Sequence, residues 1–225
     1  STQTACLVGT YNTNTGSTTS TDCLSASPGH YVDSSLGTGQ STQTACNAGT
    51  YNPSTGSTTS TDCLVADPGH YVDLLLGAGQ STQTACLAGT FNPLTGSTYD
   101  ACIGAFPGYY VDISLGPGQS TQTACLAGTY NPNSASTSST DCLVADPGYY
   151  VDSLLGTAQS SQTACLVGTY NPNTGSTTPT DCVDASPGHY VDQSGQSTQT
   201  ACLAGTFQAS SGQPSCDDAD PGHYV

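Results

Sequence analysis

A six-residue phrase, Ser-[Thr/Ser]-Gln-Thr-Ala-Cys, recurs along the whole chain and constrains the fold more than any other feature. Its period is close to 40 residues and shortens to 37 at the end. The phrase begins at Ser1, Ser41, Ser81, Ser120, Ser160 and Ser197. A fixed period of this size is typical of repeat architectures in which each unit contacts only its neighbours. We therefore divide the chain into six repeats, of which the last is partial: residues 1–40, 41–80, 81–119, 120–159, 160–196 and 197–225.

Each repeat consists of two related halves. A Gly-x-aromatic triplet recurs about every 20 residues, first as Gly9 with Tyr11 and then as Gly29 with Tyr31. The first half of a repeat carries two Cys, and the second half carries none. The sequence contains no Met and both starts and stops within the array, so we expect a mature or excised piece of a longer protein.

The comparison of the two halves predicts the disulfide pairing. Ala26 stands in the place of Cys6, and Gln43 stands in the place of Cys23. Because both members of the pair are absent together, we expect them to be bonded to each other. The predicted disulfides are Cys6–Cys23, Cys46–Cys63, Cys86–Cys102, Cys125–Cys142, Cys165–Cys182 and Cys202–Cys216. The alternative joins successive repeats, as in Cys23–Cys46. Closing a loop of this size contributes about 3 kcal/mol in the chain-entropy model.

Local sequence favours short strands. No window shows a sustained apolar period of 3.6 residues, and Gly, Pro, Asn and Thr are too dense for helices. Thr10-Tyr11 and Tyr31-Val32 are small β-prone patches flanked by turn-forming residues. We predict small disulfide-rich all-β repeats that stack as an elongated, solenoid-like rod of short hairpins, with little or no helix.

Composition excludes several classes of partner. The chain has 16 acidic residues, all Asp, and neither Lys nor Arg. It therefore lacks the cations that replace phosphate counterions, so we expect no nucleic-acid binding and no docking on anionic membranes. No apolar stretch is long enough to cross a bilayer, so we expect no membrane insertion in this segment. Apolar residues form only 35% of the chain, which makes one large core improbable, yet twelve Cys argue against disorder. A disulfide framework implies an oxidising compartment, and we expect an extracellular or cell-surface location.

Residues for catalysis are missing. The sequence has no Glu, Lys or Arg and no Gly-x-Ser-x-Gly elbow, so we expect no enzyme, no catalytic residue and no cofactor. The His residues share one position of the repeat, which Tyr109 and Tyr149 occupy elsewhere. Since Tyr cannot replace a general base or a metal ligand so freely, we expect an exposed, partly stacked ring at His30, His70, His189 and His223.

Metal binding has little support in the sequence. Calcium requires six to eight oxygen ligands, and the chain has no dense Asp-x-Asp-x-Asp loop. Asp-x-Asp occurs only at Asp218 and Asp220. Turn formation and side-chain capping account for most Asp residues. We predict no metal site, with calcium as the alternative that this pattern leaves open.

Hydroxyl-rich runs recur once per repeat and suggest covalent sugar. No Asn-x-Ser/Thr acceptor is usable, because Asn52, Asn92, Asn131 and Asn171 precede Pro and the other Asn residues lack Ser or Thr two positions on. O-linked glycan is then the natural modification of these loops. The alternative is plain turn chemistry, in which hydroxyls bond to nearby backbone. The candidate glycosylation residues are Ser17, Thr18, Thr19, Ser57, Thr58, Thr59, Ser136, Thr137, Ser176 and Thr177.

Short apolar loops in the second halves suggest self-association. Exposed Leu in a loop favours contact between chains. The alternative is a local core beneath each loop. The candidate self-association residues are Leu74, Leu75, Leu76, Ile113, Leu115, Leu154 and Leu155.

The first half of each repeat resembles a known family. Cys6, Gly9 and Tyr11 form C-x-x-G-T-Y, which is followed by a Gly-Ser-Thr turn and a closing Cys. This pattern is similar to the ephrin-receptor-like cysteine-rich repeat, itself a distant relative of the tumour-necrosis-factor-receptor module. The resemblance implies elongated, mostly β, disulfide-laddered ectodomains on cell surfaces. The second half departs from it by lacking its Cys pair, which implies either greater flexibility there or lateral packing.

Two functions follow from these patterns. The first is a structural subunit of an extracellular filament or surface fibre or stalk, which self-assembles with copies of itself and carries O-linked glycan. The second is the ectodomain of a cell-surface receptor or adhesin that acts as a binding module. The third repeat would carry the binding surface in that case, because Tyr99, Ile103, Phe106 and Tyr109 make it more aromatic.

Overall fold

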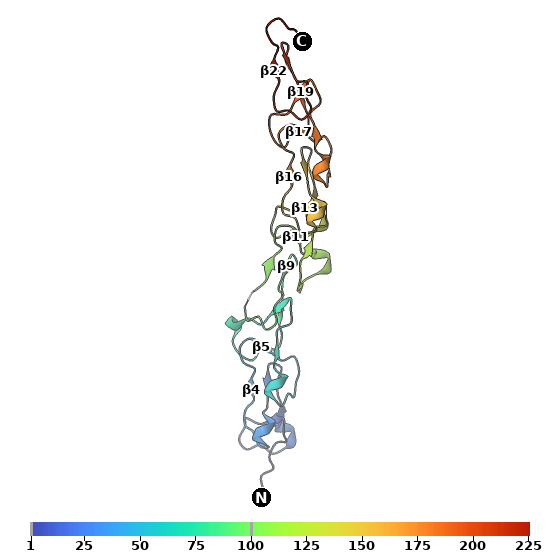
Figure 1. Cartoon of the computed structure of the whole chain (residues 1–225). Coiled ribbons are helices and arrows are strands. Elements are labelled where there is room, and N and C mark those ends of the chain that lie inside the picture. The colour runs from blue at the N-terminus through green and yellow to red at the C-terminus, as the bar shows by residue number, and fades with distance from the viewer. Residues whose placement is uncertain (1, 100) are drawn as a thin grey trace. The chain divides into compact units, whose positions relative to one another are not determined.

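The fold is built from very short elements. The structure, a computed structural model, describes residues 2–99 and 101–225. Ser1, where the first repeat begins, and Asp100 lie outside the described residues. Over the described ranges, the regular elements are two-residue strands and three-residue 3-10 turns, with no α-helix. All strand pairs with a defined register are antiparallel (Figure 1). The prediction of all-β disulfide-rich hairpins is confirmed.

The first halves form what we call the disulfide hairpins, which span residues 6–25, 46–65, 86–104, 125–144, 165–184 and 202–218. In the third of these, β9 (Thr90–Phe91) and β10 (Ile103–Gly104) occupy the strand positions. The other pairs are β1 (Thr10–Tyr11) with β2 (Leu24–Ser25), β5 (Thr50–Tyr51) with β6 (Leu64–Val65), β13 (Thr129–Tyr130) with β14 (Leu143–Val144), β17 (Thr169–Tyr170) with β18 (Val183–Asp184), and β21 (Thr206–Phe207) with β22 (Asp217–Asp218).

The second halves form the cysteine-free hairpins, which span residues 26–45, 66–85, 105–124, 145–164 and 185–201. Their pairs are β3 (His30–Tyr31) with β4 (Thr44–Ala45), β7 (His70–Tyr71) with β8 (Thr84–Ala85), β11 (Tyr109–Tyr110) with β12 (Thr123–Ala124), β15 (Tyr149–Tyr150) with β16 (Thr163–Ala164), and β19 (His189–Tyr190) with β20 (Thr200–Ala201).

Both kinds of hairpin contain 3-10 turns. In disulfide hairpins these turns precede the second Cys: η1 (Ser20–Asp22), η3 (Ser60–Asp62), η6 (Ser139–Asp141) and η8 (Pro179–Asp181). In cysteine-free hairpins they form the apolar loops: η2 (Ser34–Leu36), η4 (Leu74–Leu76), η5 (Ile113–Leu115) and η7 (Ser153–Leu155).

Six disulfides close the disulfide hairpins. The bonds are Cys6–Cys23, Cys46–Cys63, Cys86–Cys102, Cys125–Cys142, Cys165–Cys182 and Cys202–Cys216, with Cα–Cα distances between 5.5 and 5.8 Å. No Cys in the described residues is left free. The pairing within each half is therefore the one present in the structure, and the alternative between repeats does not occur.

Each hairpin is hydrogen-bonded through its backbone to the next hairpin along the chain. A disulfide hairpin joins the following cysteine-free hairpin where the Gly39 amide donates to the Cys6 carbonyl at 3.0 Å. The cysteine-free hairpin in turn joins the next disulfide hairpin, where the Gly29 amide donates to the Asn52 carbonyl at 2.8 Å. These bonds recur at equivalent positions, so within each of the compact units described below neighbouring hairpins stack in a constant register.

The apolar interior consists of small, separate clusters. Tyr11 of a disulfide hairpin packs with Ala26 and Val32 of the following cysteine-free hairpin, and all three are buried. The same trio recurs as Tyr51, Ala66 and Val72, and as Tyr130, Ala145 and Val151. Each core therefore lies between two neighbouring hairpins. A modest apolar content suffices for such clusters because covalent bonds close half of the hairpins.

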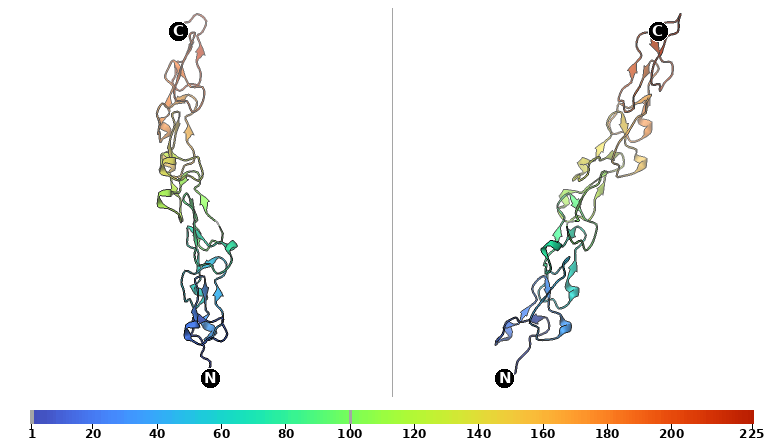
Figure 2. Two further views of the ribbon diagram at one scale, coloured as in Figure 1. Left: turned by 180° about the vertical axis from the view of Figure 1, so that it is seen from behind. Right: turned by 90° about the vertical axis from the view of Figure 1, so that its left-hand side faces the viewer.

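The chain divides into two compact units. One comprises Ser1–Ile103 with Ile113–Thr121, and the other comprises Gly104–Asp112 with Gln122–Val225. Within each unit taken by itself, the hairpins follow one another in sequence order, as the colour gradient shows (Figure 2). The division runs through the third repeat.

Candidate interaction surface

Glutamine replaces the disulfide in the cysteine-free hairpins. Gln83, at the position of the second Cys, accepts a hydrogen bond on Oε1 from the Asp67 amide at 2.8 Å. Its Nε2 donates to Asp67 Oδ2 at 2.7 Å. Ala66, at the position of the first Cys, is fully buried. We expected these halves to be either more flexible or supported by packing. The structure shows support by packing of the buried Ala and by the hydrogen bonds of the Gln. Equivalent bonds to the amide are made by Gln43, Gln122, Gln162 and Gln199.

A buried asparagine connects four of the disulfide hairpins, the second to the fifth, to the cysteine-free hairpin before each of them. Asn52 is 1% exposed. Its Nδ2 donates to the His30 carbonyl at 3.2 Å and to Ser57 Oγ at 2.7 Å, and its Oδ1 accepts from the Ser54 amide at 3.0 Å. The sequence indicates no role for Asn52 beyond its place before Pro, where it cannot be an N-glycosylation acceptor. The available signal was its fixed place after the Gly-x-aromatic triplet in the first five repeats: Asn12, Asn52, Asn92, Asn131 and Asn171.

The expected exposed ring is found only at His223, whereas His30, His70 and His189 are half-buried. The rings of His30 and His70 pack against a glycine of the next cysteine-free hairpin, Gly79 and Gly118. A Cβ added to Gly79 would lie 3.1 Å from Cε1 of His30, so the ring lies directly over this glycine of the next cysteine-free hairpin. Tyr149 lies over Gly195 in the same way, since a Cβ added to Gly195 would lie 3.0 Å from Cζ of Tyr149. Since the position requires only a flat ring, His and Tyr can exchange, as the sequence predicted.

The apolar loops are held rigidly while their leucines face outward. Asp73 begins η4, and its Oδ1 accepts from the Leu75 amide at 2.8 Å. Gln80 closes the loop by donating from Nε2 to the Asp73 carbonyl at 2.7 Å and to the Gly77 carbonyl at 3.2 Å. The alternative of a local core beneath the loop is therefore wrong. The exposed fractions are Leu74 43%, Leu75 91%, Leu76 70%, Ile113 50%, Leu115 66%, Leu154 87% and Leu155 73%.

The apolar loops dock on the hydroxyl-rich run of the next disulfide hairpin. The Leu74 amide donates to the Thr98 carbonyl at 2.8 Å, and Cδ2 of Leu74 would lie 3.8 Å from a Cβ added to Gly49. The Ser153 amide donates to the Thr177 carbonyl at 2.9 Å in the same way. The structure thus brings the apolar loops and the hydroxyl-rich runs together, although neither motif points to the other in sequence.

A second set of exposed leucines escaped sequence analysis. These residues follow the first Cys of a disulfide hairpin, in a turn where the Thr10 amide donates to the Leu7 carbonyl at 3.0 Å. The signal was present, since Leu recurs after Cys in all repeats but the second. A small groove of about 180 Å³ adjoins one of them and is lined by Tyr71, Thr84, Ala85, Leu87, Thr90 and Cys102. The exposed fractions are Leu7 75%, Leu87 78%, Leu126 74%, Leu166 76% and Leu203 75%.

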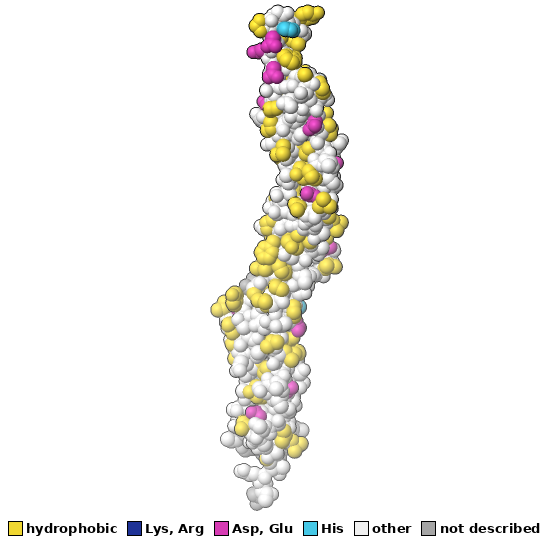
Figure 3. Space-filling view, in the orientation of Figure 1, with side chains coloured by type: hydrophobic (Ala, Val, Ile, Leu, Met, Phe, Trp, Pro, Cys, Tyr) yellow, Lys and Arg dark blue, Asp and Glu magenta, His cyan; other side chains and the backbone are white. Residues whose placement is uncertain are grey.

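The visible face of the molecule mixes apolar and uncharged polar side chains. Figure 3 shows hydrophobic side chains in many small patches among uncharged ones, with scattered acidic groups and His between them. Because Lys and Arg are absent from the chain, no ion pair of the usual kind can cover these patches. Between two copies of this chain, apolar contact and hydrogen bonding are therefore the available modes of recognition.

Three of the glycosylation candidates are wrong. Ser57, Ser136 and Ser176 are buried at 7%, 8% and 7% exposure, which leaves no room for a sugar. Ser57 and Ser176 also accept hydrogen bonds on Oγ from buried Asn side chains, both at 2.7 Å. These serines therefore belong to the joint between hairpins.

The other hydroxyl candidates fall into two groups. Ser17, Thr18 and Thr19 of the first repeat are exposed, as the prediction requires. Thr58, Thr59, Thr137 and Thr177 are half-buried. The Thr58 methyl group would lie 2.8 Å from a Cβ added to Gly9, so its side chain packs against the preceding disulfide hairpin.

Aspartates cap turns. Asp62 Oδ2 accepts from the Thr59 amide at 3.1 Å and the Thr58 amide at 2.9 Å, and these bonds lower the pKa of its carboxyl. The pKa of Asp33 is likewise lowered, first by the Ser35 hydroxyl and then by its amide. Such bonds stabilise the ionised carboxylate, so these groups serve the local fold as anions.

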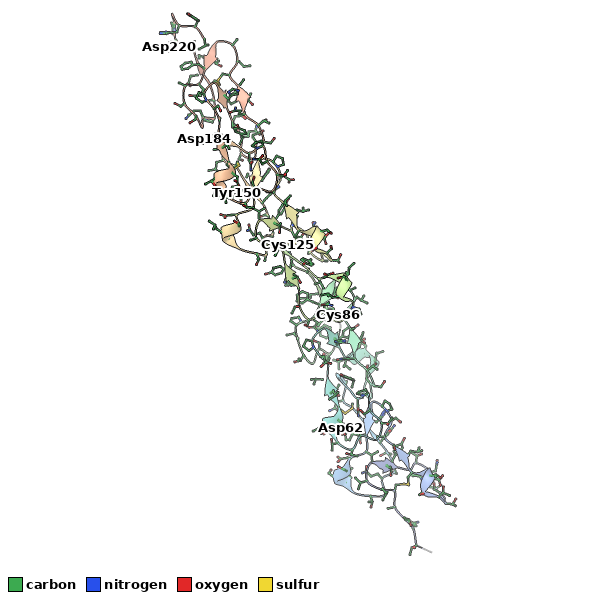
Figure 4. The ribbon with its side chains drawn as sticks, turned by 90° about the vertical axis from the view of Figure 1, so that its right-hand side faces the viewer. Asp62, Cys86, Cys125, Tyr150, Asp184 and Asp220 are labelled. Carbon is green, nitrogen blue, oxygen red and sulfur yellow. A yellow bond between two sulfur atoms is a disulfide. The ribbon has the colours of Figure 1, made fainter. Side chains whose placement is uncertain are left out.

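No metal centre or membrane span is found in the part of the chain that the structure describes. There, no three His, Cys, Asp or Glu side chains gather as ligands of a cation, and no helix is long and apolar enough to traverse a bilayer. Asp184 and Asp220, which both belong to the second unit, lie apart along the ribbon (Figure 4).

Comparison with known proteins adds no relative. No family model matches the chain, and no curated protein is significantly similar to it in sequence. Function is therefore argued from the geometry of the hairpins and their surface.

Proposed function

We propose that this protein is a non-catalytic structural subunit of an extracellular filament or surface stalk, which associates laterally with other copies through its leucine loops. The observation that carries the proposal is the pair of exposed leucines in η4 and η7. Leu75 is 91% exposed and Leu154 is 87% exposed, although Asp and Gln hydrogen bonds hold both loops in place. The six disulfides support an oxidising, extracellular setting. The likeness to ephrin-receptor-like repeats supports the same setting.

Exposed leucines on ordered loops indicate a binding surface and not merely an apolar surface without a role. Ordering a loop before contact reduces the entropy that association must overcome. Each Leu contact is weak, but contacts that recur with the repeat can act together between two chains. A net charge of −16 opposes such contact, so salt should promote it by screening the repulsion.

The proposal is tested with the purified chain by light scattering and negative-stain microscopy over a range of NaCl. We expect fibres that increase with salt. The loop variant L75S/L76S/L154S/L155S should remain monomeric. A matched control, L7S/L87S/L126S/L166S, removes the same number of exposed leucines from the other set and should still assemble. Monomers at every salt concentration, or equal loss of fibres in both variants, would contradict the proposal.

The alternative is a binding module on a cell-surface ectodomain. The observation that favours it is the third repeat, in which Tyr99 is 65% exposed and Ile103 is 41% exposed. Large exposed aromatic residues are enriched in binding surfaces. A discrete monomer in the microscopy experiment, together with a ligand whose binding is lost in Tyr99→Ser, would favour this function.

A further inference from the structure

One loop of the disulfide hairpins keeps a hydroxyl in every repeat. The residue stands immediately before the turn position that has a positive φ, such as Gly56 at 71°. It is Thr in four repeats and Ser in two, and it is exposed in all six. The six residues are Thr15, Thr55, Thr95, Ser134, Thr174 and Ser211.

The fold gives these hydroxyls no partner. None of the six side-chain oxygens makes a hydrogen bond within the described structure, whereas nearby hydroxyls do. Thr50 Oγ1 donates to the Asn47 carbonyl at 2.7 Å, and Ser57 Oγ accepts from Asn52 at 2.7 Å. The positive φ of the next residue explains glycine there, but it places no demand on the residue before it. Turn chemistry therefore does not account for the hydroxyl.

The residue just before each of these hydroxyls differs between repeats, although the hydroxyl itself does not. The preceding residue is Asn, Ser or Leu, as in Asn14, Ser54 and Leu94. A position that keeps its hydroxyl while its neighbour changes to Leu is under a separate requirement. The segment Ser41–Ala45 also carries exposed hydroxyls, but it recurs almost unchanged as a block, so its hydroxyls give no separate signal.

Thr55 also borders an open depression of about 490 Å³ on its own hairpin. Thr61, Asp62 and Leu64 line the same depression. A first sugar on Thr55 would find room there, with hydroxyl and carboxylate groups for its own hydroxyls and an apolar side chain for its ring face. The loop is thus both accessible to a transferase and shaped to hold the product.

We propose that these six hydroxyls are the O-glycosylation sites of the protein, one in each disulfide hairpin. The inference rests on the proposed function, since it places sugar on the exterior of an extracellular subunit. The reaction joins the side-chain oxygen to the anomeric carbon of a nucleotide sugar. The bond from that carbon to the diphosphate breaks, the nucleoside diphosphate leaves with the electron pair, and a base of the host transferase takes the hydroxyl proton.

The experiment is site mapping on the chain secreted from eukaryotic cells. A protease that cleaves at Asp is needed, because the sequence has no Lys or Arg for trypsin. Cleavage at Asp33 and Asp62 gives a peptide that contains both Thr55 and Ser57, and electron-transfer fragmentation then locates the added mass. We expect sugar on Thr55, Thr95 and Thr174 and none on Ser57.

Matched variants complete the test. T55A/T95A/T174A should lower the sugar content in proportion to three of six sites, while T42A/T82A/T121A should leave it unchanged. A mass equal to that of the bare sequence, or sugar confined to other hydroxyls, would overturn the inference. Assembly is scored separately on unglycosylated chain from the bacterial periplasm. Fibres without sugar sites would reject the inference alone, and mapped sugar on a monomer would reject only the proposed function.

Discussion

At the scale of single residues, the buried asparagines determine how one hairpin holds the next. Asn171 is fully buried and donates to the Tyr149 carbonyl at 3.0 Å and to Ser176 Oγ at 2.7 Å. One side chain thereby satisfies groups from two hairpins. Within the described residues, no buried side-chain nitrogen or oxygen lacks a hydrogen-bond partner. Removal of the Asn171 amide would leave buried groups without a hydrogen-bond partner.

We expect Asn171→Ala to lower the free energy of unfolding by about 2–3 kcal/mol, because three side-chain hydrogen bonds are lost and buried acceptors remain. Urea denaturation with intact disulfides, followed by Tyr fluorescence, measures the change. Asn173→Ala is the matched control, since Asn173 is exposed and only its backbone amide is bonded, to Asn171 Oδ1. A similar loss in both variants would show that the buried amide has no special role.

Ala135 carries backbone strain that its equivalents avoid. It has a φ of 56° where the other repeats have Gly, as at Gly175 with 70°. A side chain in this conformation costs roughly 1–2 kcal/mol, and the greater freedom of unfolded Gly offsets part of the gain from removing it. We expect Ala135→Gly to stabilise the protein by about 0.5–1 kcal/mol and Gly175→Ala to destabilise it by a similar amount. Opposite signs in thermal unfolding are the decisive readout.

At the scale of elements, the two kinds of hairpin share one fold and differ in how they are closed. The cysteine-free hairpin uses a buried Ala and a bonded Gln where its neighbour uses a disulfide. Ala145 and Gln162 are separated by the same 17 residues as Cys125 and Cys142. Their backbones should therefore meet at a distance that a disulfide can bridge.

We expect the variant A145C/Q162C to form a seventh disulfide and to gain about 1–2 kcal/mol. Loop closure contributes about 3 kcal/mol, and the lost Gln162 hydrogen bonds offset part of it. Intact mass, which falls by two hydrogen atoms, and thiol labelling of the folded protein report the bond. Ala145→Cys alone serves as the control that cannot close. Free thiols in the folded double variant would disprove the equivalence of the two closures.

At the scale of the whole molecule, contacts between nearest neighbours limit how far a local change can spread. Stability in such an array is close to a sum of hairpins and their joints. This suits the extracellular subunit that we propose, because damage to one joint leaves the others in place. Uniform repeats also present the same surface many times.

Hydrogen exchange of Asn171→Ala tests this locality. The Gly148 and Val151 amides donate to the Asn171 and Ser176 carbonyls, so their exchange should accelerate roughly tenfold or more. The equivalent amides Gly69 and Val72, which bond to Asn92 and Ser97 in the first unit, should exchange as in the unaltered protein. Acceleration across both units would mean that the chain unfolds as a single cooperative block.

The sequence by itself predicted the short strands, favoured the disulfide pairing within each half and indicated that His and Tyr exchange at one position. Each of these depends on residues within about 20 positions, and the two-part repeat let one half serve as a comparison for the other. Only the tertiary structure decided that Ser57 and Asn52 are buried while Leu75 is exposed. The physical reason is that the preceding hairpin, more than 20 residues away, covers Ser57 and Asn52, whereas no hairpin covers Leu75. Residue type alone does not predict which side chains are buried in so polar a chain. Ser and Asn that hydrogen-bond to a neighbouring backbone can be buried as completely as an apolar Val.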